Sequence, residues 1–353
     1  GRLPDIMQQD YAMLNRWVKK GWVVPLDAYV KSDMLDLKHV LDASLATGRM
    51  DGNLFGISAG TNTQAIVIDV DVFKKAGIEL PSSQWSWEDF EQLANKLHEK
   101  TGIWAIGERL ISPPLLWQSY FLGYGQWAYN ASGTGLGYTD DLLINYLNML
   151  LRLQKSGAIP DRSKTENLYS EPGNNIENRL IVSGKSAMDY IWSNQIVALW
   201  EAAGSERHFK LMPLPRPRGG KPSNYLKPSM FFSLTPGAKH PKEAAVFLDF
   251  LTNSLDANEI LMADRGVPIS FVIRENLLLL LSPAQFEMFV YLSQIEYDNS
   301  PTPPPNPAVH GDIVGREFYS DFINPVLFGD VTPERAVRIF REKTNRILND
   351  PSQ

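Results

Sequence analysis

Apolar residues recur at helical spacing in several stretches of the chain. Trp87, Phe90, Leu93, Ala94 and Leu97 fall at helical spacing in a predicted helix, and residues 86–89 form a capping box that begins it. Similar patterns, begun by a cap residue or a proline, predict helices over 10–20, from 139 to Gly157, and from Pro241, Pro283 and Pro333 onward. On the helix that begins at Pro241, the residues expected to face inward are Ala244, Ala245, Phe247, Leu248 and Leu251.

Short β-branched and apolar runs lie between these helices. They predict strands at 3–7, 64–68, 103–106, 187–191, 211–214 and 230–234. Because strands and helices alternate, we expect an α/β chain with mostly parallel sheets. The chain has 353 residues, which is enough for two domains.

Three polar or proline-rich segments are candidates for a chain crossing between domains. They lie at 59–63, 213–229 and 298–310, and the last two contain clusters of proline, which keeps a linker extended. Each segment on its own also fits an ordinary surface loop.

Composition removes several classes of function. The chain has no Cys, which excludes disulfide frameworks, Cys-ligated zinc, iron–sulfur clusters and thiol nucleophiles. Its five His are scattered, so we expect no metal site and no cofactor. A net charge of −6 argues against a nucleic-acid partner. The longest apolar runs are about five residues, far below the ~18 that a membrane helix requires.

Two patterns in the sequence bear on a catalytic role. Residues 56–60 read G-x-S-x-G, but a β-branched strand follows where the nucleophile elbow requires a helix, so we do not expect Ser58 to be catalytic. Paired carboxylates of the glycosidase type cannot be singled out among 40 acidic residues, so a glycan-degrading enzyme stays open as an alternative.

The chain resembles the extracellular solute-binding proteins of ABC transporters, family 1, the maltose-binding-protein-like group. The resemblance rests on seven motifs that occur in the same order along the chain. They are Leu3-Pro4-Asp5-Ile6 with 21–27, 51–57, 72–78, Trp85-Ser86-Trp87-Glu88-Asp89-Phe90, 180–188, 236–245 and Arg265-Gly266-Val267-Pro268. The chain begins on a strand, without an initiator Met or a signal peptide. Compared with the family layout, we expect about 60 residues to be missing before it.

The resemblance implies a two-lobed, periplasmic-binding-protein-like α/β fold of type II, with mixed sheets flanked by helices. Lobe one is expected at 1–60 and 230–296, and lobe two at 64–226 and 297–353. The three interdomain crossings are then expected near 61–63, 227–230 and 296–300. Such lobes close on a ligand by a hinge motion.

The resemblance also implies a function. We expect a non-enzymatic, monomeric protein outside the cytoplasm, either a cell-surface lipoprotein or a periplasmic protein. It would capture a sugar or oligosaccharide between its lobes and deliver it to an ABC permease. A non-sugar solute, such as a glycerol phosphate or a polyamine, is the alternative within this class.

Sugar binding requires aromatic rings for the apolar ring faces and polar side chains for the hydroxyls. By motif position, the expected ligand contacts are Gln9, Asp10, Tyr11, Asn62, Trp117, Trp127, Trp192, Asn194, Met230 and Arg265. Other roles stay open: core packing for the tryptophans, helix capping for Asp10 and Asn62, and a surface ion pair for Arg265. If Arg265 and Lys227 face the ligand, their positive charges favour an acidic sugar as the ligand.

Overall fold

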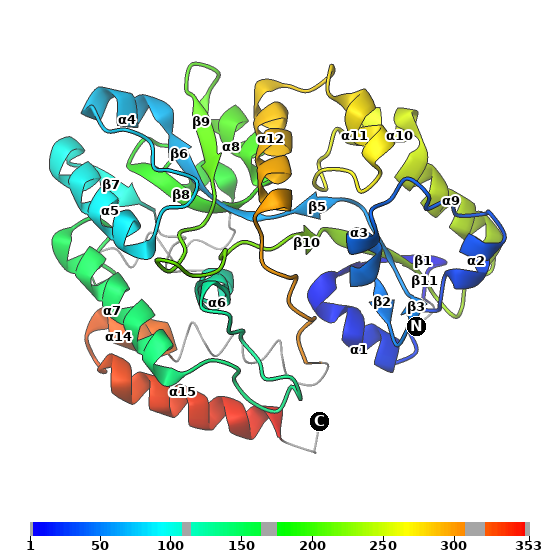
Figure 1. Ribbon diagram of the computed structural model, residues 1–353, viewed down its shortest axis with the longest axis horizontal. Coiled ribbons are helices and arrows are strands. Elements are labelled where there is room, and N and C mark those ends of the chain that lie inside the picture. The colour runs from blue at the N-terminus through cyan, green and yellow to red at the C-terminus, as the bar shows by residue number, and fades with distance from the viewer. Residues whose placement is uncertain (1–2, 108–113, 164–174, 308–321, 350–353) are drawn as a thin grey trace. The chain divides into compact units, whose positions relative to one another are not determined.

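The computed structural model describes residues 3–107, 114–163, 175–307 and 322–349 (Figure 1). The chain forms two compact units. Unit 1 comprises Gly1–Thr63, Leu226–Gln294 and Pro301–Ala308, and unit 2 comprises Gln64–Tyr225, Ile295–Ser300 and Val309–Gln353. Residues 301–307, which the sequence groups with the second lobe, pack with unit 1, because the Tyr11 hydroxyl donates to the Pro303 carbonyl at 2.8 Å and Thr302 Oγ1 donates to the Leu226 carbonyl at 2.7 Å.

Unit 1 contains an antiparallel sheet in the order β1-β11-β4, formed by Ile6–Asp10, Met230–Leu234 and Ile57–Ser58. The register places Ile6 opposite Leu234 and Asp10 opposite Met230. The predicted strand at 3–7 is therefore displaced toward the C-terminus. Pro4 has no N–H to donate to a ladder, and Asp5 instead accepts hydrogen bonds from the backbone of Lys239 and His240.

Smaller strands and helices complete unit 1. The strand pairs are β2 (Arg49–Met50) with β3 (Asn53–Leu54), and β5 (Thr61–Asn62) with β10 (Lys227–Pro228). The helices are the 3-10 turn η1 (Tyr11–Met13), α1 (Leu14–Lys19), α2 (Asp27–Lys31), α3 (Asp42–Thr47), α9 (Pro241–Asn253), α10 (Leu255–Leu261), α11 (Phe271–Leu277) and α12 (Pro283–Tyr297), whose last turn belongs to unit 2. Leu26, Leu35, Leu54, Leu234 and Leu248 form the centre of the core.

One expected core residue of α9 lies at the surface. Ala244, Ala245 and Leu248 are buried as predicted, but the Phe247 side chain is 48% exposed and stacks on the exposed Phe250 ring at 6.4 Å. The apolar arc of this helix is wider than the stripe that the core covers, so the helical pattern alone assigns too many residues to the interior.

Unit 2 contains a four-stranded sheet in the order β7-β8-β6-β9, formed by Trp104–Ile106, Ser186–Trp192, Gln64–Asp69 and Phe209–Met212. The prediction of mostly parallel sheets is wrong: of the described pairs, only β7 with β8 is parallel. Helix α8 (Gln195–Ala203) connects β8 to β9, and these two strands run the same way. However, β6 lies between them in the opposite direction. The sheets are therefore mixed.

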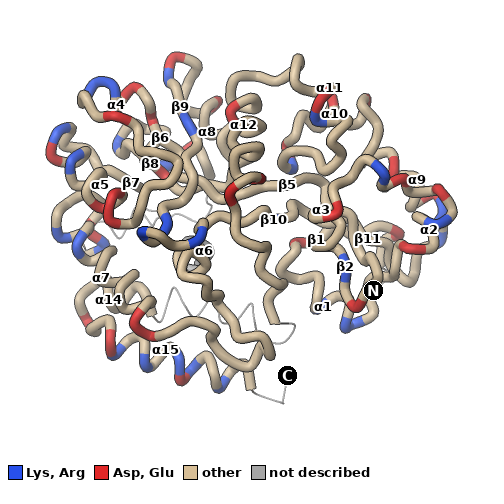
Figure 2. The backbone as a smooth tube through the Cα atoms, in the orientation of Figure 1, with Lys and Arg blue, Asp and Glu red and all other residues tan. Residues whose placement is uncertain are grey.

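The helices of unit 2 include the three that the sequence predicts, over Trp87–Thr101, Asp140–Ser156 and Pro333–Leu348. The helices of this unit are α4 (Val70–Ala76), α5 (Trp87–Thr101), α6 (Pro114–Gly123), α7 (Asp140–Ser156), α8, the 3-10 turn η4 (Ile176–Asn178), α14 (Asn324–Phe328) and α15 (Pro333–Leu348). The predicted capping box is confirmed, since Ser86 Oγ accepts from the Asp89 N–H and the Asp89 carboxylate accepts from the Ser86 N–H. Helix α7 ends at Gly157 in the left-handed conformation, also as predicted. Acidic and basic residues are interspersed along α15 (Figure 2).

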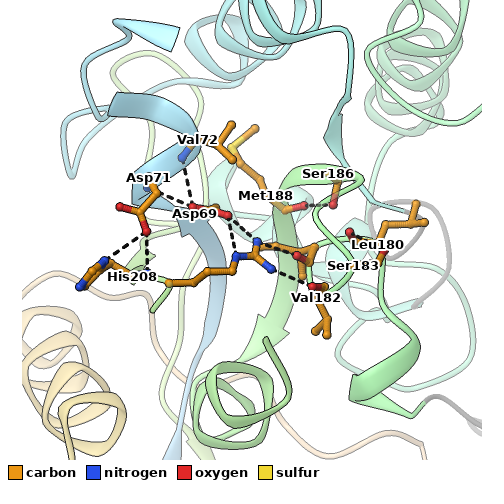
Figure 3. A network of polar contacts seen from close by, with 11 residues as sticks. Asp69, Asp71, Val72, Leu180, Val182, Ser183, Ser186, Met188 and His208 are labelled. Atoms are coloured by element: carbon orange, nitrogen blue, oxygen red, sulfur yellow. Dashed lines mark hydrogen bonds and ion pairs between the residues drawn. The ribbon is translucent and has the colours of Figure 1, made fainter. Parts of the chain in front are cut away.

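A network of polar contacts lies at the end of β6 (Figure 3). The Asp69 carboxylate accepts from the backbone of Asp71 and Val72 and thereby caps α4. The same carboxylate forms an ion pair with the Arg207 guanidinium. Arg207 Nη1 also donates to the Val182 carbonyl at 2.7 Å. One guanidinium thus bonds the end of β6 to the turn that precedes β8.

Candidate functional site

Asp10 and Lys227 form an ion pair at the C-terminal end of β1, within unit 1. Asp10 Oδ1 accepts from the Ala12 N–H at 2.8 Å, which caps the 3-10 turn after the strand, while Oδ2 accepts from Lys227 Nζ at 2.9 Å. The Asp10 side chain is 40% exposed. Asp10 therefore has both the capping role left open by the sequence and an oxygen that solvent can reach.

Gln9 and Tyr11 flank Asp10, and both are buried in unit 1. Gln9 Nε2 donates to Ser233 Oγ at 2.6 Å, whereas Gln9 Oε1 accepts no hydrogen bond from the described residues. The Tyr11 hydroxyl donates to the Pro303 carbonyl, and burial raises the pKa of Tyr11 above its ordinary value. These contacts support the structure of unit 1, and Gln9 Oε1 is the acceptor left for another donor.

Asn62, Met230 and Arg265 lie in the same region of unit 1. Asn62 is opposite Lys227 in the β5–β10 pair, and its Nδ2 donates to the Arg265 carbonyl at 3.3 Å. Met230 is opposite Asp10. The Arg265 side chain is half exposed, and its Nε lies 3.3 Å from the Asp264 carboxylate. The structure thus brings together the predicted residues of unit 1 through adjoining strands, although they are distant in sequence.

Close backbone packing places Arg265 beside β5. A Cβ atom on Gly60 would lie 2.7 Å from the Gly266 carbonyl oxygen, a contact that the backbone could relieve only by shifting. Thr61 and Val267 form a bridge at the same place. Glycine at position 60 therefore permits the approach of the two segments.

Trp192 and Asn194 lie at the end of β8, within unit 2. Trp192 is half-buried and lies opposite Gln64 on β6. Its backbone N–H donates to Gln195 Oε1 at 3.0 Å, and Asn194 is the residue that precedes α8. A half-exposed indole at the end of a buried strand is suited to stacking on a ligand.

Trp127 and Trp117 are the other predicted aromatic contacts of unit 2. The Trp127 ring is half-buried and meets the Tyr225 ring edge to face at 5.9 Å. Trp117 lies in α6, but its side chain is outside the described residues. Trp127 therefore packs partly against the core, one of the roles that the sequence left open.

Sequence reasoning missed the buried amides next to these tryptophans. Gln64 and Asn224 are almost fully buried, and Asn224 Nδ2 donates to the Gln64 carbonyl at 2.6 Å. Ser119, in the same helix as Trp117, donates its hydroxyl to Gln64 Oε1. The two amides are 160 residues apart in sequence, and no local pattern marks such a pair.

The G-x-S-x-G serine has a structural role. Ser58 is buried in β4; its Oγ donates to the Gly60 carbonyl at 2.6 Å and accepts from the Ser229 N–H at 3.0 Å. These bonds join the chain on both sides of the β5–β10 pair. The hydroxyl is thus occupied by backbone partners.

A cavity of about 170 Å³ lies within unit 1. It is lined mostly by apolar residues from β4, β11, α9 and α10, which include Ile57, Phe232, Leu248 and Leu261, together with the polar residues Gln8, Ser58, Thr252 and Asn258. Among the predicted ligand contacts, only Arg265 lines it. Because most of the lining is apolar, the cavity is a poorer match for a sugar, whose hydroxyls need polar partners, than the polar residues near Asp10.

The described residues also bear on metal binding and on membrane insertion. They contain no group of three or more His, Asp or Glu that could hold a metal ion. None of their helices has both the length and the apolar character needed to cross a membrane. The pKa values of Asp27, Asp36, Asp71 and Asp89 are all lowered, in each case because hydrogen bonds to the carboxylate outweigh any cost of burial.

Comparison with solved structures supports the fold. A family 1 extracellular solute-binding protein from Alicyclobacillus acidocaldarius is 28% identical, with a TM-score of 0.81, over 98% of this chain and 84% of that protein. A periplasmic oligogalacturonide-binding protein from Yersinia enterocolitica, solved with saturated digalacturonic acid, is 21% identical, with a TM-score of 0.81 and the same coverage. The predicted α/β fold with mixed sheets flanked by helices is thereby confirmed.

Sequence comparison leads to the family. An arabinooligosaccharide-binding protein from Bacillus subtilis is 27% identical over 100 residues, which span 28% of this chain and only 23% of that protein. The family model of the bacterial extracellular solute-binding proteins matches residues 1–254, well over half of the chain. The chain therefore belongs to the bacterial extracellular solute-binding protein family.

Proposed function

We propose that this protein captures a sugar or oligosaccharide outside the cytoplasm and delivers it to the permease of an ABC importer. The observation that carries the proposal is the match of the solute-binding family over residues 1–254. The fold, shared with solved binding proteins over nearly the whole chain, supports it.

The chemistry of the two units supports a sugar as the solute. Unit 1 offers the partly exposed Asp10 carboxylate together with Asn62, which can satisfy hydroxyl groups. Unit 2 offers Trp192 and Trp127, whose rings can cover the apolar face of a pyranose or furanose. We propose Asp10, Asn62 and Trp192 as principal ligand contacts, with Trp127 and Asn194 beside them.

Charge pairing favours a neutral oligosaccharide over an acidic one. Lys227 is paired with Asp10, and Arg265 is paired with Asp264, so each cation is balanced by a neighbouring carboxylate. The Bacillus relative is named for arabinooligosaccharides and the Yersinia protein was solved with a digalacturonate. We therefore expect arabino-oligosaccharides to bind more tightly than oligogalacturonides.

The same proposal holds that the protein binds without catalysis, acts as a monomer, and is either a surface lipoprotein or a periplasmic protein. The match to a family described as solute-binding supports binding without catalysis. The description of the family as extracellular supports a place outside the cytoplasm.

The test is isothermal titration of the protein with arabino-, galacturono- and malto-oligosaccharides, glycerol 3-phosphate and spermidine. We expect saturable binding of a neutral oligosaccharide, and chromatography of the recovered sugar should show it intact. Shorter sugar products would contradict binding without catalysis. Saturation by only the phosphate or the polyamine would contradict a sugar ligand.

A further inference from the structure

A cluster of buried polar residues in unit 2, which we call the Asn224 hub, consists of Gln64, Ser119, Asn224 and Ser300. Each has at most 2% of its surface exposed. They come from the start of β6, from α6, and from the chain that follows β9 and α12. Buried polar groups lower stability unless they are hydrogen-bonded. The role of the hub in unit 2 therefore depends on its hydrogen bonds.

Asn224 is the centre of the hub. Its Nδ2 donates to the Gln64 carbonyl at 2.6 Å, and its Oδ1 accepts from the Leu214 N–H at 2.8 Å. Its backbone carbonyl accepts from the Ser300 N–H at 2.9 Å. One amide therefore bonds to segments that are far apart in sequence, using a donor on one side and an acceptor on the other. A carboxylate, which only accepts, or an ammonium group, which only donates, could not make both bonds.

The hub adjoins each tryptophan proposed for unit 2. Gln64, which Asn224 fixes, lies directly opposite Trp192 in the β6–β8 register. The residue after Asn224 is Tyr225, whose ring meets Trp127 at 5.9 Å. Ser119, which donates to Gln64 Oε1, is two residues after Trp117 in α6.

We infer that Asn224 is a positioning residue for the aromatic part of the ligand site. It sets ligand affinity through the placement of Gln64 and Tyr225, and hence of Trp192 and Trp127, without contacting the ligand itself. This inference rests on the proposed function, because it assigns Asn224 to the site at which a sugar would bind.

The test replaces Asn224 by Asp, which has the same shape. Ionised, the new carboxylate keeps an acceptor for the Leu214 N–H but places an oxygen against the Gln64 carbonyl, where the two repel each other. Protonated, its hydroxyl can donate to that carbonyl again. Because a buried carboxyl has a raised pKa, a shift from pH 8 to pH 5 restores the donor.

The matched control is Asn258→Asp in unit 1. Asn258 is also buried, and its Nδ2 also donates to backbone carbonyls, those of Leu251 and Ser254 at 3.1 and 2.9 Å. The substitution removes the same kind of donor from a helix that contributes none of the proposed contacts. It reports the effect of a general loss of stability on binding.

For N224D we expect the Kd for the best-binding oligosaccharide to rise about tenfold at pH 8 and to return to within about twofold of wild type at pH 5. N258D should lower the melting temperature without changing Kd at either pH. An unchanged Kd of folded N224D at pH 8 would overturn the inference, as would an equal loss in N258D. Should N224D fail to fold at pH 8, Ser119→Ala is the second variant, with an expected rise in Kd of about threefold; no rise would overturn it as well.

A readout without ligand separates this inference from the proposed function. In protein labelled with 5-fluorotryptophan, the ¹⁹F resonances of Trp192 and Trp127 should shift in N224D at pH 8 and return at pH 5. N258D should leave them in place. Binding of no sugar by the wild type would contradict the proposed function alone, whereas unmoved resonances in N224D would contradict the positioning role alone.

Discussion

The two ends of strand β6 are fixed by different chemistry. At Asp69 the bonds are ionic: a carboxylate that is 2% exposed pairs with Arg207, which is 22% exposed and also donates to backbone carbonyls (Figure 3). At Gln64 the bonds are neutral and involve the Asn224 amide and the Ser119 hydroxyl. The first end caps a helix, and the second adjoins the proposed ligand contacts.

This difference suggests that stability and affinity have separate determinants in unit 2. The bonds at Asp69 connect β6 to α4 and to the turn that precedes β8, and none of the residues that make them is a proposed ligand contact. At the Gln64 end, amides and hydroxyls fix the orientation of their hydrogen-bond partners without carrying a net charge. We therefore expect changes at Asp69 to act on unfolding and changes near Gln64 to act on binding.

The largest effect is expected from Asp69→Ala. Removal of the carboxylate leaves the Arg207 guanidinium without its ionic partner and α4 without its cap. The free energy of unfolding should fall by about 3 kcal/mol, as for other broken buried pairs. Urea unfolding followed by circular dichroism measures it. A large change in ligand Kd for the folded variant would contradict the separation of the two ends.

Trp192→Ala should have the next largest effect, and it should act on binding. Loss of a stacking ring from the centre of a site costs about 2 kcal/mol, which corresponds to roughly thirtyfold in Kd. Titration calorimetry with the best-binding oligosaccharide measures it.

Trp200→Ala is the matched control, because Trp200 is a half-buried tryptophan of the same unit that packs on Phe209 at 5.7 Å, near Arg207. It should lower stability and leave Kd unchanged. Equal losses of affinity in the two variants would show that the Gln64 end has no special part in binding.

The smallest effect is expected from pH at the Asp69 end. Burial opposes ionisation of Asp71, but its hydrogen bonds with His208 together outweigh this, so its pKa is lowered. A lowered pKa gives stability that is present above the unfolded pKa of about 3.9 and is lost as the pH falls through the folded value.

Asp71→Asn should therefore lower the free energy of unfolding at pH 7 by about 0.5 kcal/mol, since the pair is partly exposed. The difference from wild type should shrink as the pH falls from 5 to 3. Thermal melts of both proteins across this range provide the measurement, and a gap that widened on acidification would contradict the assignment.

Local signals predicted the longest helices, α5, α7, α9, α12 and α15, but not most of the shorter ones. The Ser86–Asp89 box and the end of α7 at Gly157 depend on residues within one or two turns, and both are confirmed. The direction of β6 was not predictable, because a strand pattern does not show which neighbour a strand will pair with. Phe247 shows the same limit for burial, since its position in the helical pattern predicts burial but about half of its surface is exposed.

The candidate site was predictable only in part. Motif position indicated Asp10, Asn62 and Met230, and the structure places these near one another in unit 1. The Asn224 hub left no signal, because its partners are up to 160 residues away along the chain. Residues that position others through distant backbone groups become visible only when the fold brings them together.

The most direct test of the account is a crystal structure of the protein grown with the oligosaccharide that binds most tightly. We predict an intact sugar stacked on the Trp192 ring, with its hydroxyls bonded to Asp10 or Asn62. A cleaved sugar, or a ligand located in the apolar cavity of unit 1 and away from Trp192, would contradict it.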